Sequence, residues 1–182
     1  MSFKSMAVFC GSKPGKNPLY AEHAAQLGTL MAQQGITMIY GGGKNGLMGS
    51  VADSCMAGGG TVRGVIPTRL IEWETQHTGI SELTVVENMH QRKRLIYELC
   101  DAAIILPGGF GTLDELFEVL TWNGLALHDK KVFLLNSGGF YEHLLRHLQQ
   151  LQDDGLLYGN LAEQITILAS PEELNEYIRI AF

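Results

Sequence analysis

The sequence has few cysteines and no long apolar run, and each shortage excludes a class of protein. Its three cysteines, Cys10, Cys55 and Cys100, are odd in number and far apart, which indicates neither a disulfide framework nor a zinc site of paired cysteines. No segment approaches the length of a membrane span, and residues 1–5 lack a basic stretch followed by an apolar one. We therefore expect a reduced protein in the cytoplasm, with no membrane partner.

Basic residues are also scarce. Thirteen Lys and Arg against 19 Asp and Glu give a formal net charge of −6, which argues against a nucleic-acid partner but allows a local basic site for a small anion. Among the six histidines, His143 and His147 are four residues apart on a predicted helix. They lack the glutamate of an HExxH motif and a third ligand, so the sequence predicts no metal site.

Short apolar segments alternate with amphipathic ones along all 182 residues, with 46% hydrophobic residues spread evenly. This length suits one domain, residues 1–182, with a substantial core. Repeated strand–helix alternation predicts an α/β fold, a doubly wound parallel sheet of about seven strands with helices on both faces. The expected strands are 6–10, 36–40, 61–66, 83–86, 102–106, 131–135 and 164–168, and the expected helices are 18–34, 47–57, 89–99, 112–125, 140–152 and 171–180.

Ligands of parallel α/β sheets bind at the carboxyl ends of the strands. This rule places Gly11 and Ser12, the segment 41–46 and the segment 108–112 along one edge of the predicted sheet. Residues 68–82 show mixed polarity and no clear period, and we expect them to form an active-site loop or a short helix.

The segment 107–115, with sequence PGGFGTLDE, joins an apolar strand to a helix through a glycine turn. The glycines allow close approach of a ligand, and the first amides of the helix are free to bind a phosphate. Thr112 adds a hydroxyl, and Glu115 lies one turn further on nearly the same helical face. A carboxylate there suits a ligand part that becomes positive, such as a ribosyl ring losing its base. The alternative is a plain strand-to-helix turn whose acid favours the helix dipole.

The segment 41–46, GGGKNG, formally matches the dinucleotide fingerprint GxGxxG. It follows the second predicted strand instead of the first, and the next strand ends in Val65-Ile66-Pro67 without a ribose-binding acid. It also lacks the GK[ST] of a P-loop. Neither nicotinamide nor triphosphate chemistry is indicated, and a ligand-facing loop and a structural turn remain open alternatives.

Three consecutive basic residues, Arg92, Lys93 and Arg94, stand near the start of a predicted helix. Successive residues rotate by about 100°, so the three cannot serve one ligand together. A solvated face is the simple explanation, but the helix dipole disfavours cations at this end. Because a guanidinium is a rigid two-pronged donor, Arg92 is a candidate clamp for a phosphate and for Glu115.

The two signatures MHQRK, at 89–93, and PGGFGTLDE, at 107–115, resemble the Lonely Guy family of cytokinin riboside 5'-monophosphate phosphoribohydrolases, long mislabelled as lysine decarboxylases. The resemblance covers nearly the whole chain and implies a Rossmann-like domain that forms at least a dimer, with the active site near the subunit interface. It also implies hydrolysis of the N-glycosidic bond of a purine nucleoside 5'-monophosphate, without a cofactor. A decarboxylase dependent on pyridoxal phosphate would need a Schiff-base lysine that nothing here singles out.

By position, the resemblance implies that Arg92 and Glu115 are the catalytic pair. Phe110 stands where many relatives have tyrosine and Asp114 where many have glutamate, and neither change removes a proposed catalytic group. A nucleotide-binding or cofactor-carrier protein without catalysis is the alternative function. Sheet edge and resemblance together give these expected substrate contacts: Ser12, Gly42, Gly43, Glu74, Met89, Arg92, Lys93, Gly108, Gly109, Phe110, Gly111, Thr112, Leu113, Asp114, Glu115 and Thr121.

Overall fold

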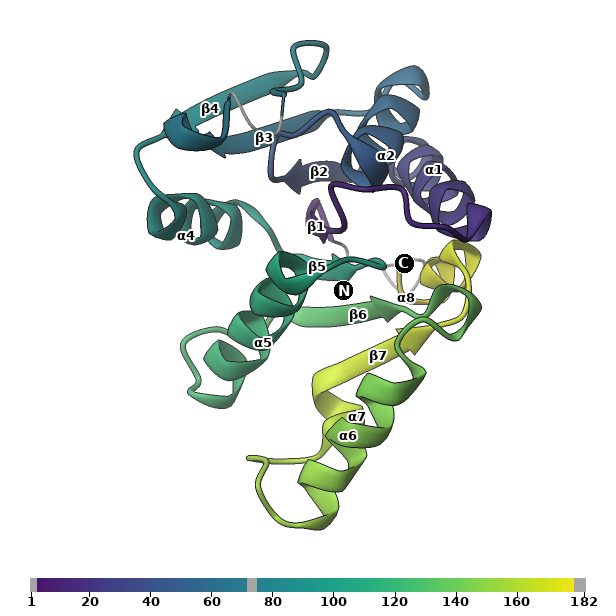
Figure 1. Ribbon diagram of the computed structural model, residues 1–182, viewed down its shortest axis with the longest axis vertical. Helices are drawn as coiled ribbons and strands as arrows, with labels where there is room; N and C mark the ends of the chain where they lie inside the picture. Colours follow the sequence, from purple (N-terminus) through teal and green to yellow (C-terminus); the bar gives the residue numbers. More distant parts are fainter. Residues whose placement is uncertain (1–2, 72–74, 179–182) are drawn as a thin grey trace.

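A computed structural model describes residues 3–71 and 75–178, and its strands form one parallel sheet (Figure 1). Within the described residues the seven strands lie in the order β4-β3-β2-β1-β5-β6-β7, and every neighbouring pair is parallel. The predicted fold class is therefore confirmed. The strands are β1 (Ser5–Phe9), β2 (Thr37–Tyr40), β3 (Val62–Pro67), β4 (Glu82–Val86), β5 (Ala102–Ile105), β6 (Lys131–Leu135) and β7 (Ile165–Leu168).

Helices cover both faces of the sheet because its central strands are apolar on both sides. In β1, Met6 and Val8 belong to one core cluster and Ala7 and Phe9 to the other, as the two-residue period of a strand requires. The first cluster packs against α1 (Pro18–Gln33), α2 (Gly46–Ala57), η3 (Pro171–Leu174) and α8 (Asn175–Ile178). The second packs against α4 (Met89–Leu99), α5 (Phe110–Gly124), α6 (Glu142–Asp153) and α7 (Leu161–Gln164).

The direction of winding reverses beside β1. The chain runs outward from β1 to β4 and then returns through α4 to β5, on the other side of β1. The turns that follow β1 and β5 lead to opposite faces, and one hydrogen bond joins them, from Gly11 N to Pro107 O at 3.0 Å. Such a switch point is the usual ligand-binding crevice of an open α/β sheet.

Several element boundaries differ from the sequence-based prediction. The predicted helix 171–180 begins as the 3-10 turn η3 and continues as α8, and η2 (Ser137–Gly139) precedes α6. The irregular segment contains η1 (Thr68–Leu70) and an isolated antiparallel bridge between Gly43 and Gln76. No helix in the described part of the chain is long and apolar enough to cross a membrane.

Candidate active site at the switch point of the sheet

A cavity of about 630 Å³ opens at the switch point, between the turn after β1 and the turn from β5 into α5. Its wall contains ten of the expected substrate contacts, brought together from three separate segments of the chain. They are Ser12, Met89, Arg92, Gly108, Gly109, Phe110, Gly111, Thr112, Asp114 and Glu115.

The amino terminus of α5 forms one wall of this cavity. Gly109 caps the helix in an extended conformation, with φ −97° and ψ −154°, and its carbonyl accepts a hydrogen bond from Leu113 N at 3.1 Å. The amides of residues 110–112 precede that first bond, so they have no acceptor within the helix and sit at its positive end. This wall is therefore suited to an anion such as a phosphate.

Thr112 packs tightly on the turn before the helix. Its side chain is buried, and a Cβ on residue 108 would lie 2.1 Å from its Oγ1. Glycine at position 108 is thus what allows Thr112 to fold back on the turn. The sequence requires this glycine for packing as well as for the approach of a ligand.

Arg92 lies in the first turn of α4, which begins at Met89 because Asn88 caps it by accepting a hydrogen bond from Gln91 N at 3.0 Å. Only 5% of Arg92 is exposed. Its Nε donates to Val65 O at 3.1 Å and its Nη2 to Gly41 O at 2.8 Å, at the carboxyl ends of β3 and β2. The guanidinium is therefore held over the strand ends by backbone acceptors.

Glu115 lies on the second turn of α5 and lines the same cavity as Arg92. Burial, and to a lesser extent the negative charge of Glu115, raise the pKa of the Cys10 thiol at the end of β1 well above its usual range. Cys10 also lines the cavity. The structure thus places a carboxylate, a guanidinium and the amino terminus of a helix around one cavity.

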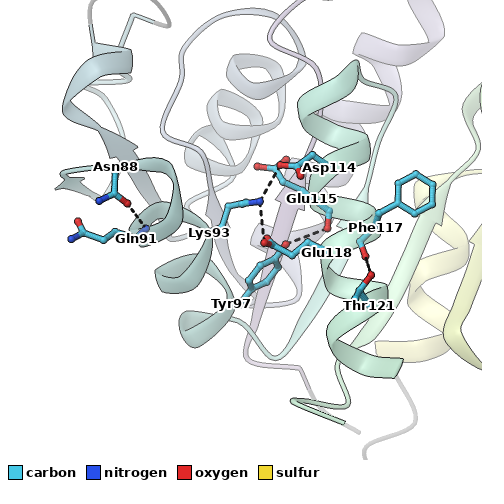
Figure 2. Close-up of polar contacts among 9 residues, drawn as sticks. All are labelled: Asn88, Gln91, Lys93, Tyr97, Asp114, Glu115, Phe117, Glu118 and Thr121. Atoms are coloured by element: carbon cyan, nitrogen blue, oxygen red, sulfur yellow. Dashed lines mark hydrogen bonds and ion pairs between the residues drawn. The ribbon is translucent and has the colours of Figure 1, made fainter. Parts of the chain in front are cut away.

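Five expected contacts lie elsewhere in the described structure. Lys93 Nζ binds Asp114 at 3.1 Å and Glu118 at 3.0 Å, between α4 and α5 (Figure 2). Thr121 donates its hydroxyl to Phe117 O at 2.6 Å, and Leu113 is likewise absent from the cavity lining. Gly42 and Gly43 also lie outside it. Glu74 falls outside the described residues.

The glycine loop after β2 has a structural role. Gly42 has φ +76°, and its carbonyl accepts a hydrogen bond from His77 N at 2.9 Å. Lys44 N donates a hydrogen bond to Thr75 O at 3.0 Å, so a second bond joins the loop to the same segment. The loop is paired with residues 75–77, which supports the structural alternative for this motif.

Several cavity residues escaped the sequence analysis. Tyr20 and Phe140 form an edge-to-face pair with centroids 5.4 Å apart, although they are far apart in the sequence. Gly41 accepts a hydrogen bond from Arg92 and lines the cavity, and in the sequence only its place in the glycine loop 41–46 indicated a position near the site. Other lining residues without a motif include Lys13, Leu47, Met48 and Leu70.

The fold and the site together define a Rossmann-like α/β protein with a helix amino terminus, a carboxylate and a guanidinium in the same cavity. Comparison with known proteins specifies the class further. The family model described as "Possible lysine decarboxylase" matches residues 48–178.

A cytokinin riboside 5'-monophosphate phosphoribohydrolase from Rhodococcoides fascians is 45% identical over 155 residues, which are 85% of this chain and 78% of that protein. Another with this name, from Arabidopsis thaliana, is 45% identical over 167 residues, or 92% of this chain and 76% of that protein. The chain belongs to this family, the Lonely Guy family.

Solved structures agree on the fold. A molybdenum cofactor binding protein from Rippkaea orientalis has a TM-score of 0.73 at 23% identity, over 98% of this chain and 97% of that one. The molybdenum cofactor carrier protein from Chlamydomonas reinhardtii has a TM-score of 0.75 at 18% identity, over 96% and 95%. These likenesses establish the architecture alone.

Proposed function

We propose that this protein hydrolyses the N-glycosidic bond of a purine nucleoside 5'-monophosphate, of the cytokinin or adenine type, and releases the free base and ribose 5-phosphate. Relatives at 45% identity carry the name of this activity, over most of both chains. The observation that supports it most directly is the cavity shared by Arg92, Glu115 and the amino terminus of α5.

In this proposal the 5'-phosphate binds at the amino terminus of α5. The amides of residues 110–112 and the Thr112 hydroxyl donate to its oxygens, and the helix dipole favours its charge. Ser12 lies across the cavity, on the turn after β1. Binding the phosphate at a fixed point holds the ribose beside Glu115. The energy of phosphate binding thereby orients C1' for the reaction.

The proposed chemistry is displacement of the base by water at C1' of the ribose. As the bond to the base breaks, the electron pair leaves with the base and positive charge develops on the sugar ring. The Glu115 carboxylate stabilises that charge and accepts a proton from the attacking water, and this proton passes through solvent to the departing base, so that the oxygen of water ends on C1' and the carboxylate is restored. Arg92 orients the carboxylate and the phosphate. These roles call on no metal or cofactor.

Chromatography of the reaction products tests the proposal. AMP and an N6-prenylated analogue should each give free base and ribose 5-phosphate, and adenosine, which lacks the phosphate, should be a poor substrate. Equal activity on adenosine would reject the role of the α5 terminus. Saturable AMP binding without any base release would favour a nucleotide or cofactor carrier instead.

The homodimer and the cytoplasmic location expected from the sequence stay predictions. Light scattering on the purified protein tests the first, and fractionation of the source cells tests the second.

A further inference from the structure

Arg92 and Glu115 stand on different helices, so their separation depends on how α4 packs against α5. Polar contacts cross between these helices beside the cavity (Figure 2). Lys93 Nζ lies 3.1 Å from Asp114 Oδ2 and 3.0 Å from Glu118 Oε1. Tyr97, one turn further along α4, donates its hydroxyl to Glu115 O at 3.2 Å.

These contacts are adjacent in sequence to the two cavity residues. Lys93 directly follows Arg92, and Asp114 directly precedes Glu115. Asp114 and Glu118 are four residues apart and share one face of α5, so one ammonium binds two successive turns of that helix. Such a contact restricts both rotation of α5 about its axis and sliding of α5 along α4.

The contact of Lys93 with Glu118 is largely shielded from water, whereas the Asp114 side chain is 59% exposed. The side chain of Lys93 is 13% exposed, and Glu118 Oε2 is buried without a hydrogen-bond partner among the described residues. Burial by itself lowers the pKa of Lys93, but its hydrogen bonds to Glu118 and Asp114 outweigh burial and raise it, so the ammonium stays charged. Burial and the carboxylates of Glu118 and Glu115 raise the pKa of Tyr97, so its hydroxyl remains a donor.

We propose that Lys93, together with Tyr97, is a positioning residue that fixes the separation and orientation of Arg92 and Glu115. The inference rests on the proposed function for its catalytic consequence. The resemblance to the family implied that Lys93 contacts the nucleotide. In this structure Lys93 lies outside the cavity lining, and two carboxylates of α5 engage its ammonium.

Steady-state kinetics separates the two roles. Lys93→Gln alone would leave the partly buried Glu118 carboxylate without its cation, so the informative variant is Lys93→Gln combined with Glu118→Gln. A positioning role predicts that kcat for AMP falls roughly 10- to 100-fold, because small displacements of catalytic groups are costly. KM for AMP and the inhibition constant of ribose 5-phosphate should stay within about twofold of wild type. A tenfold or greater rise in both constants with unchanged kcat would identify a phosphate ligand and overturn the proposal.

Two single variants complete the design. Lys93→Arg keeps the charge and should retain most of kcat. Arg94→Gln is the matched control, because Arg94 pairs with Glu98 on the surface of the same helix, its side chain 77% exposed, and its loss should leave kcat unchanged. An equal loss of kcat in Arg94→Gln would also overturn the proposal, since a general effect on α4 would then explain the result.

The free energy of unfolding in urea tests the contact between Lys93 and Glu118 independently of enzyme activity. A double-mutant cycle of Lys93→Gln and Glu118→Gln should show clear coupling, because removing one partner of this partly buried ion pair leaves the other charge poorly solvated. If the two substitutions change the free energy of unfolding additively, Lys93 and Glu118 do not hold α4 and α5 together, and the proposal is overturned. If the wild-type protein releases no base from AMP, the proposed function is rejected. The double-mutant cycle would then still test whether Lys93 and Glu118 join α4 to α5.

Discussion

The guanidinium of Arg92 occupies the space that a side chain on residue 41 would need. A Cβ built on Gly41 would lie 1.9 Å from Nη2 of Arg92, and Gly41 O accepts from that same nitrogen at 2.8 Å. Glycine at position 41 therefore has two effects on Arg92: its carbonyl accepts a hydrogen bond, and its lack of a side chain leaves room for the guanidinium. The two residues are 51 positions apart in the sequence.

We predict that Gly41→Ala lowers turnover of AMP strongly, by about 100-fold, because the methyl group displaces the guanidinium from the strand ends. Circular dichroism should show an intact fold. Gly124→Ala is the control, since a Cβ there meets nothing within 4 Å. Similar rates in the two variants would mean that the observed place of Arg92 is not needed for catalysis.

Glu115→Gln keeps the shape of the side chain and removes its charge. If the carboxylate stabilises a sugar cation, kcat should fall by orders of magnitude while KM changes little. Arg92→Ala should cause a comparable loss of kcat/KM. Free base quantified by chromatography measures both, and near-normal rates in either variant would refute the assigned pair.

Gly108→Ala tests the proposed binding of phosphate at the amino terminus of α5. Because the new Cβ would lie 2.1 Å from Thr112 Oγ1, Thr112 has to move and the first turn of α5 with it. We expect a rise in KM for AMP of about tenfold or more and weaker inhibition by ribose 5-phosphate. An unaltered inhibition constant would place the phosphate elsewhere.

Buried thiols make stability fall at alkaline pH. Burial raises the pKa of Cys55, and also that of Cys100, from 9.0 to about 11. Between these values the unfolded chain releases protons that the folded chain retains, so the free energy of unfolding decreases as pH rises, by about 1.4 kcal/mol per thiol per pH unit.

Urea unfolding at pH 8 and pH 10 measures this loss. Cys55→Ala removes one thiol, and its stability should fall less over that interval, by roughly 1.4 kcal/mol. An identical loss in the variant and wild type would show that Cys55 does not keep its proton in the folded state.

The sequence determined the architecture because short-range patterns encode it. Apolar segments such as Ala102–Ile105 are buried on both sides of a parallel strand, and residues 107–115 carry their own turn and helix start. Local chemistry thus indicated the strands and the switch-point edge, and it predicts an anion site there. Residues 89–93 and 107–115 also indicated the family.

Tertiary structure alone decided which side chains meet. The three basic residues of α4 look alike in the sequence, yet Arg92 is buried against Val65 and Gly41, Lys93 pairs with α5, and Arg94 stays on the surface. The reason is geometric. Rotation of about 100° per residue sends neighbours in different directions, and only the packing of α4 on the sheet and on α5 sets what each one reaches.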